Sequence, residues 1–221
     1  MKKDKNILII VLIAFVSVVV QLLLSFLLIF WLSSIPAKKI DGIENYSKLY
    51  YIETYGGELD SNLSVFPDDT SILIEPTFKS SMLMGLLDTE GYIILTSKYS
   101  LDNFNKELER LSVLSMTIKE GCFENSNTYT NYVKYDTTSY EYPSYITLDG
   151  YRSRYEYALI NKDELEITYV YLSYPEIYNT NYRKYLKKDK GIYFNDNTLA
   201  LFSMYHHTFD NGKSYMEFGD C

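Results

Sequence analysis

The chain has 221 residues, a formal net charge of −8 and 47% hydrophobic residues, and these averages conceal two unlike parts. The first 37 residues carry a net charge of +2, so the rest of the chain carries −10. An acidic bulk argues against nucleic-acid binding, which depends on Lys and Arg neutralising phosphates. An aromatic content of 16% argues against disorder, and two Cys are too few for a disulfide-dense scaffold.

Residues 7–32 form an almost wholly apolar run, and no charged residue lies between Lys5 and Lys38. As a helix this run would be roughly 39 Å long, which exceeds the hydrocarbon core of a bilayer, about 30 Å thick. Trp31 lies where an interfacial aromatic residue is expected. We therefore predict a short N-terminal tail at residues 1–6 and a transmembrane anchor helix at residues 7–34 that contacts membrane lipid.

A cleavable signal peptide is the alternative, with Ile35-Pro36-Ala37 as a weak cleavage site. The apolar core of a signal peptide spans only about 7–15 residues, however, and residues 7–32 are far longer.

The orientation of the anchor rests on a tied count of lysines on its two sides. The short N-terminal tail favours a cytoplasmic N-terminus, which makes this a single-pass protein of the cell membrane with residues 35–221 extracytoplasmic. The tied lysines are Lys2, Lys3 and Lys5 against Lys38, Lys39 and Lys48.

Three polar residues, Ser17, Gln21 and Ser25, are spaced four apart and share one face of the predicted anchor helix. In lipid, such groups can hydrogen-bond to a neighbouring helix and form a homo- or hetero-oligomer. The alternative is that the hydroxyl groups bond back to their own helix and that Gln21 is tolerated.

The remainder is predicted to hold a linker and lead-in segment at residues 35–70 and an α+β domain at residues 71–221. The domain is expected to contain a mainly antiparallel sheet with one or two helices packed on it. Strands are predicted at 77–87 and 92–99, joined at 88–91. A helix is predicted at 101–111, with Ser100 as its N-cap and Arg110 on its wet side. Its expected apolar stripe is Leu101, Phe104, Leu108 and Leu111.

Residues 140–172 are predicted to form a three-strand meander. Asp149-Gly150 is expected to be a two-residue turn that places Tyr142 opposite Tyr157, and residues 161–163 the next turn. This register gives an apolar face and a charged face, and the charged one is expected to be solvated. The expected apolar row is Tyr140, Tyr142, Ile146, Leu148, Tyr151, Tyr155, Tyr157, Leu159, Leu165, Ile167, Tyr169 and Tyr171. The expected charged row is Glu141, Thr147, Arg152, Arg154, Glu156, Glu166 and Thr168.

The C-terminal part is predicted to hold a short helix and a hairpin. The helix is suggested by Tyr178, Tyr182, Tyr185 and Leu186, with Asn179 or Thr180 near its start and Gly191 just beyond its end. The hairpin is expected at 198–209 and 213–218, around Asn211-Gly212.

All 24 Tyr lie between Tyr46 and Tyr215, which indicates either an aromatic core or a platform for a glycan or protein partner at the cell envelope. We favour the core, because most patterned Tyr fall on the predicted apolar face.

A basic cluster is expected to be a solvated helix end, or else a contact for anionic lipid or wall polymers. Its members are Arg183, Lys184, Lys187, Lys188 and Lys190.

No catalytic, cofactor-binding or metal-binding residue is assigned, because the sequence has no HExxH, CxxC, GxSxG or P-loop motif. An envelope hydrolase using His206 or His207 with Glu217 or Asp210 is kept as an alternative. Whether Cys122 and Cys221 pair stays open, because spacing alone cannot establish a disulfide.

Three functions follow from these observations. The favoured one is a membrane-anchored extracytoplasmic domain with a non-catalytic binding or scaffolding role at the cell envelope. The others are the envelope hydrolase and an accessory subunit of a membrane complex that assembles through Ser17, Gln21 and Ser25.

Overall fold

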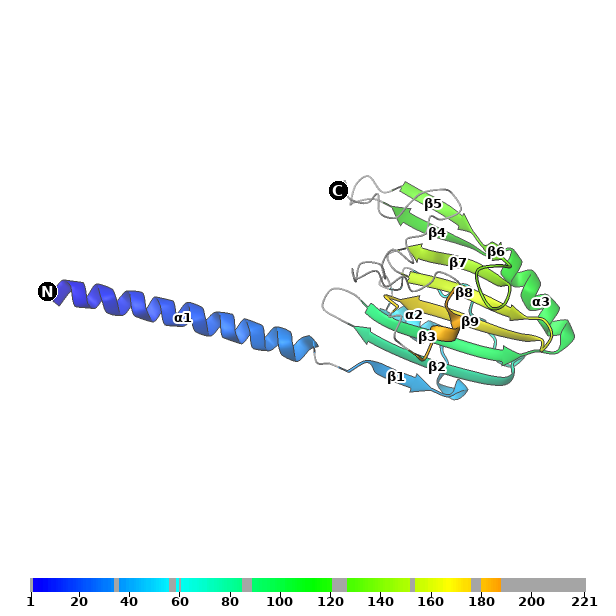
Figure 1. The fold of residues 1–221 in the computed structure, drawn as a ribbon, viewed down its shortest axis with the longest axis horizontal. Helices are drawn as coiled ribbons and strands as arrows, with labels where there is room; N and C mark the ends of the chain where they lie inside the picture. The colour runs from blue at the N-terminus through cyan, green and yellow to red at the C-terminus, as the bar shows by residue number, and fades with distance from the viewer. Residues whose placement is uncertain are drawn as a thin grey trace. The chain divides into compact units, whose positions relative to one another are not determined.

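The computed structural model describes residues 2–33, 36–55, 59, 61–84, 89–120, 127–151, 154–175 and 180–187, and it divides into two compact units (Figure 1). The first unit holds helix α1 (Lys2–Ser33) and the second holds every other described element. The helical elements of the second unit are η1 (Ile43–Asn45), α2 (Lys48–Tyr55), α3 (Leu101–Ser112) and η3 (Arg183–Tyr185). Its strands are β1 (Lys38–Asp41), β2 (Ile74–Met84), β3 (Thr89–Lys98), β4 (Ser115–Glu120), β5 (Asn127–Tyr132), β6 (Lys134–Asp136), β7 (Ser144–Tyr151), β8 (Arg154–Asn161) and β9 (Glu166–Ser173).

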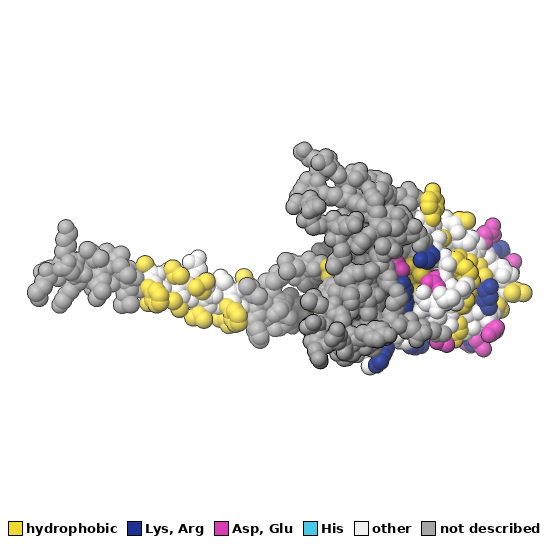
Figure 2. All heavy atoms as spheres, turned by 45° about the horizontal axis from the view of Figure 1, so that its top comes forward, with side chains coloured by type: hydrophobic (Ala, Val, Ile, Leu, Met, Phe, Trp, Pro, Cys, Tyr) yellow, Lys and Arg dark blue, Asp and Glu magenta, His cyan; other side chains and the backbone are white. Residues whose placement is uncertain are grey.

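Helix α1 extends through the whole apolar run of the sequence. Its side chains are described for residues 13–28, where the large apolar groups are exposed (Figure 2). Across the part of the chain whose side chains are described, no helix is both long and apolar enough to cross a membrane.

Seven strands of the second unit form one sheet in the order β1-β2-β3-β9-β8-β7-β6, and every neighbouring pair is antiparallel (Figure 1). Strands β4 and β5 form a separate two-stranded sheet. The predicted α+β class, a mainly antiparallel sheet with a few helices, is therefore confirmed.

Both faces of the central strands are buried. One face packs against α2, α3 and the connection between α2 and β2, through Tyr51, Phe104 and Leu111 among others. The other face packs against Tyr140 and against Tyr182 and Tyr185 near η3. The sequences of these strands are almost continuously apolar, because the side chains on both faces of each strand are buried.

This two-sided burial corrects the meander predicted for residues 140–172. Side chains of even number in β8, such as Ala158 and Ile160, enter one core, while Tyr155 and Tyr157 enter the other. The expected solvated face is therefore wrong, and Glu156 and Arg154 are buried on it. The expected grouping of Tyr155 and Tyr157 with Tyr169 and Tyr171 is also wrong, since the two pairs line opposite faces.

The predicted turn at Asp149-Gly150 is wrong as well. Both residues belong to β7, and Tyr151 pairs with Arg154, so that residues 152–153 connect the two strands. Two register shifts in β7 accompany this pairing. Asp149 is instead held by the ammonium of Lys187, whose Nζ lies 2.7 Å from both carboxylate oxygens.

The next hairpin is displaced by three residues from the predicted register. Asn161 pairs with Glu166, Ile160 with Ile167 and Tyr157 with Val170, so that residues 162–165 form the turn. The observed pairing is favoured because it matches apolar residues on both faces, whereas the predicted pairing considered one face only.

The earlier strand pair is confirmed, with a shifted connection. Strand β2 pairs with β3 from Met84 and Thr89 onward, so residues 89–91, expected in the turn, belong to β3. Gly91 has a positive φ of 148°, and a Cβ atom there would lie 2.0 Å from the carbonyl oxygen of Ser81. The close approach of two strands therefore requires glycine at this position.

The predicted central helix is also confirmed. α3 begins after Ser100, whose side chain accepts a hydrogen bond from the backbone N–H of Asn103. Phe104 and Leu111 are buried, as expected, but Leu101 is exposed. The second predicted helix is, among described residues, the single 3-10 turn η3, and the predicted C-terminal hairpin lies outside the described residues.

The segment at residues 35–70, expected to be a linker and lead-in, contains β1, η1 and α2. β1 extends the sheet by pairing with β2. Tyr51 and Tyr55 of α2 are buried in the core, as are four apolar residues of the following connection, Leu59, Leu63, Val65 and Phe66. The aromatic and apolar side chains of its described residues cover one face of the sheet.

We expect Gly91→Ala to lower the free energy of unfolding by at least about 2 kcal/mol, because the new Cβ collides with backbone and the φ is unfavourable for alanine. Urea unfolding of the full chain in mild detergent, followed by tyrosine near-UV circular dichroism, measures this change. Ser81→Ala, on the facing strand, is the matched control. Equal stability of the two variants would contradict the close approach.

Candidate functional site

The most polar part of the described interior surrounds the α2–β2 loop, which we define as residue 59 and residues 61–73. This loop has no regular secondary structure over its buried part, yet Leu59, Leu63, Val65 and Phe66 are completely inaccessible to solvent. Buried backbone without a strand or helix partner needs hydrogen bonds from elsewhere.

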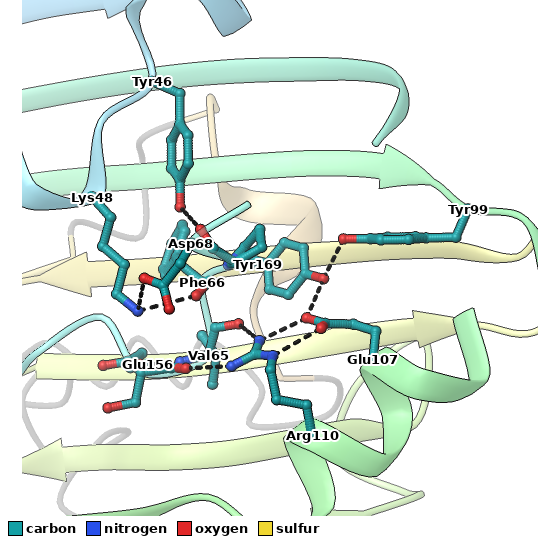
Figure 3. A network of polar contacts seen from close by, with 12 residues as sticks. Tyr46, Lys48, Val65, Phe66, Asp68, Tyr99, Glu107, Arg110, Glu156 and Tyr169 are labelled. Atoms are coloured by element: carbon teal, nitrogen blue, oxygen red, sulfur yellow. Dashed lines mark hydrogen bonds and ion pairs between the residues drawn. The ribbon is translucent and has the colours of Figure 1, made fainter. Parts of the chain in front are cut away.

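Side chains of the domain supply those hydrogen bonds to the carbonyl groups of the α2–β2 loop. The Tyr171 hydroxyl donates to the Leu59 carbonyl at 2.8 Å. Lys48 donates to the Phe66 carbonyl at 3.2 Å, and the Tyr46 hydroxyl donates to the Pro67 carbonyl at 2.7 Å. These donors come from the region before α2, from α2 itself and from β9, so they attach the loop to all three. Figure 3 shows the contacts of Tyr46 and Lys48.

Arg110 of α3 makes the next two of these contacts. Its guanidinium donates to the Ser64 carbonyl at 2.9 Å and to the Val65 carbonyl at 2.6 Å. The same guanidinium donates to both carboxylate oxygens of Glu107, at 2.8 and 2.6 Å. The prediction that Arg110 lies on the wet side of its helix is therefore only half right, since 33% of its side chain is exposed against 5% for Glu107.

Two tyrosines extend this ion pair into the core. The Tyr169 hydroxyl donates to Glu107 Oε1 at 2.7 Å. The Tyr99 and Tyr169 hydroxyl oxygens lie 2.5 Å apart. Because the single proton of Tyr169 is used on Glu107, Tyr99 must donate to Tyr169. Burial raises the pKa of both phenols, Tyr99 and Tyr169, so both remain protonated donors.

Glu156 of β8 binds the same loop from the sheet. Its Oε1 accepts the backbone N–H of Val65 at 2.7 Å, and its Oε2 accepts the Ser61 hydroxyl. Glu156 is completely buried, and burial raises the pKa of its carboxyl group. Hydrogen bonds from Ser61 and Val65 and the charge of Lys48 offset this effect only in part.

A second buried ion pair lies on strand β7, away from the loop. Asp149 and Lys187 leave only 13% and 6% of their side chains exposed. The Lys187 ammonium also lies over the Tyr140 ring, 5.8 Å from its centroid. This pair attaches the segment after η3 to the sheet.

The hydrogen bonds of this network hold the α2–β2 loop in place rather than prepare a side chain for proton transfer to a substrate. Glu107 accepts three hydrogen bonds, and Arg110 donates to two backbone carbonyls as well as to Glu107. Such a saturated network orders the groups that take part in it. Among the described residues, no cluster of three or more His, Cys, Asp or Glu side chains has the arrangement of a metal site.

The residues of the hydrolase alternative are not placed by the structure. His206, His207, Asp210 and Glu217 lie outside the described residues, as do Cys122 and Cys221. The hydrolase and the disulfide therefore stay untested.

Ser17, Gln21 and Ser25 lie on α1 within the described residues. The Ser25 hydroxyl donates to the Gln21 carbonyl at 2.9 Å, as the second interpretation of this face expects. Association of helices through the side chain of Gln21 stays a prediction.

The tyrosine-rich region is mainly core. Among the described residues, eleven Tyr side chains are buried, in the two clusters on either face of the sheet. Tyr132, Tyr135 and Tyr142 are exposed. Of the basic cluster, Arg183 and Lys184 are exposed, whereas the Lys187 side chain is buried in its ion pair, and Lys188 and Lys190 lie outside the described residues.

The sequence contains one signal that could have predicted the network. Glu107 falls three residues after Phe104 and four before Leu111, so it lies on the apolar face of its helix. A carboxylate on a buried stripe requires a partner. Nothing in the sequence identified Glu156 in the same way, because the assumed register placed it on a wet face.

We expect Arg110→Ala to lower the free energy of unfolding by about 2–3 kcal/mol, since it leaves Glu107 unpaired and two loop carbonyls without donors. Lys106→Ala, which removes an exposed pair with Asp102 on the same helix, should cost less than about 0.5 kcal/mol. Hydrogen exchange of the Leu63, Val65 and Phe66 amides should accelerate only in Arg110→Ala. Unchanged exchange would contradict the role of Arg110.

We also expect a pH-dependent effect of Glu156→Gln. The raised pKa of Glu156 means that its contribution to folding is fully present below the unfolded value, near 4.5, and is lost as pH rises through the folded value. Glutamine does not titrate, so the variant should gain stability relative to the parent chain between about pH 4.5 and pH 8. Urea midpoints at the two pH values, with Glu166→Gln as the control, measure this. A stability difference that does not change with pH would refute it.

Comparisons of this chain with protein families, with curated protein sequences and with solved structures find no match. No residue role can therefore be transferred from a relative, and the function has to be inferred from the chain's own residues and contacts.

Proposed function

We propose that the chain is a single-pass membrane protein whose folded domain has a non-catalytic binding or scaffolding role at the cell envelope. Residues 7–32 are the anchor, the N-terminus is cytoplasmic and residues 35–221 are extracytoplasmic. The observation that carries the proposal is an uncharged apolar run that continues as one unbroken helix, α1.

The length and surface of α1 support the anchor. The proposal rests on the whole run of residues 7–32, which is longer than the stretch 13–28 whose side chains are described. As a helix the run is roughly 39 Å long, against about 30 Å of hydrocarbon. Within the described stretch, the large apolar side chains are 38–67% exposed, a continuous apolar surface for which lipid is a better solvent than water.

The non-catalytic role is supported by how the described interior uses its polar groups. Glu107, Arg110 and Glu156 are committed to each other, to tyrosine hydroxyls or to the α2–β2 loop. Buried tyrosines fill both faces of the sheet instead of lining a platform. These groups stabilise a rigid domain, and a rigid domain on a tether is suited to binding or scaffolding.

The orientation is supported by the lysines that precede the anchor, Lys2, Lys3 and Lys5. Lysines that flank an apolar segment tend to stay on the cytoplasmic side of the membrane. The lysines after the anchor oppose this tendency equally in number, so the orientation needs a direct test.

We expect deletion of residues 7–32 to release the chain from membranes, whereas Gln21→Leu, which keeps the apolar length, should leave it membrane-bound. Carbonate extraction at high pH measures this, and near-UV circular dichroism confirms that the deleted chain still folds. External protease should digest the domain on intact spheroplasts. Membrane retention of a folded deletion variant would refute the anchor, and protection from protease would refute the orientation.

A further inference from the structure

Three basic side chains from distant parts of the sequence gather on one face near the β1 edge of the sheet. Lys39 of β1 pairs with Ser81 of β2, and Lys79 lies two residues along β2, so both point to the same face. The ammonium groups of Lys79 and Lys184 both lie over the Tyr185 ring, 5.8 and 4.8 Å from its centroid. We call Lys39, Lys79 and Lys184 the basic patch.

The basic patch holds like charges close together. Lys79 is half-buried and donates to the Asn181 carbonyl at 2.7 Å. Loss of water on burial and the positive charge of Lys184 lower the pKa of Lys79, and Asp41, its partner across the strands, opposes this shift. The three cations of the basic patch outnumber this one carboxylate, in a part of the chain (residues 38–221) whose net charge is −10. An anionic surface would relieve this repulsion.

The sequence holds the basic patch close to the anchor. Only residues 34–37 separate the end of α1 at Ser33 from the start of β1 at Lys38. Even fully extended, this connection reaches roughly 18 Å. If α1 ends at the membrane interface, Lys39 stays within roughly 22 Å of the headgroups, which is under about three Debye lengths at physiological salt. The short connection to the anchor therefore keeps the basic patch at a high effective concentration near the membrane surface.

We propose that the basic patch docks the folded domain onto anionic phospholipid headgroups of the membrane in which the chain is anchored. The inference rests on the proposed function, because it needs the anchor. The contact is electrostatic, so it weakens as salt rises. The basic residues come from β1, β2 and η3, and docking therefore engages the folded domain and not merely the sequence next to the anchor.

The full chain in lipid nanodiscs provides the test. A brief pulse of an acetylating reagent, with mass spectrometry of each lysine, compares discs of phosphatidylcholine with discs containing phosphatidylglycerol. We expect labelling of Lys39, Lys79 and Lys184 to fall about three-fold or more in the anionic discs and to recover in high salt. Lys106 and Lys162, exposed on α3 and in the β8–β9 turn, should be labelled equally in both discs.

A charge-matched pair of variants separates docking from general attraction. Lys39→Glu with Lys184→Glu should abolish the protection of Lys79 in anionic discs, and Lys106→Glu with Lys162→Glu should preserve it. Near-UV circular dichroism checks that both variants fold. Equal labelling of the parent chain in the two lipids, or equal effects of the two variants, would overturn the proposal.

Co-elution of the chain with the discs keeps the two proposals distinguishable. A chain that does not enter the discs refutes the anchor, and with it the tether on which docking depends. A chain that enters the discs but shows lipid-independent labelling refutes the docking surface alone. Protection that is as strong in neutral discs also refutes it, because the contact would then not depend on headgroup charge.

Discussion

The domain depends on one constraint: an irregular stretch of backbone, the α2–β2 loop, is buried and its polar groups must still be satisfied. Five side chains meet this requirement for the carbonyl groups and for one amide: Tyr46, Lys48, Arg110, Glu156 and Tyr171. They come from the chain before the loop, from α3 and from two central strands. The loop thereby replaces a second layer of helices over one face of the sheet, and its apolar side chains complete that core.

The same requirement explains why charged residues lie in the interior. Glu107 neutralises Arg110, which allows the guanidinium to serve two half-buried carbonyls at little electrostatic cost. Tyr169 and Tyr99 then complete the hydrogen bonding of Glu107. Tyrosine is used here as an apolar ring with one donor, which suits a core that must also satisfy loop backbone. The abundance of tyrosine in the sequence is consistent with that use.

Local features of the fold were predictable from the sequence, and long-range ones were not. The cap at Ser100 and the spacing of Phe104 and Leu111 are local signals, so α3 was correctly predicted. The predicted register of β7, β8 and β9 was wrong because it assumed a solvated face, whereas Ala158 and Ile160 enter a core on that face. At the site, the position of Glu107 on an apolar stripe was a usable signal, but its tyrosine partner Tyr169 lies too far along the chain to be inferred from spacing.

The attachment of the α2–β2 loop has a consequence for how the chain folds. The hydrogen-bond partner of the Leu59 carbonyl, the Tyr171 hydroxyl, lies 112 residues further along the chain. The partner of the Ser61 hydroxyl, the Glu156 carboxylate, lies 95 residues further along. Contacts of such long sequence separation form slowly and late. At roughly 5–20 residues per second, synthesis alone delays them by about 5–20 s. During this interval the nascent chain exposes the apolar side chains of Leu63 and Phe66, and this exposure favours aggregation until folding is complete.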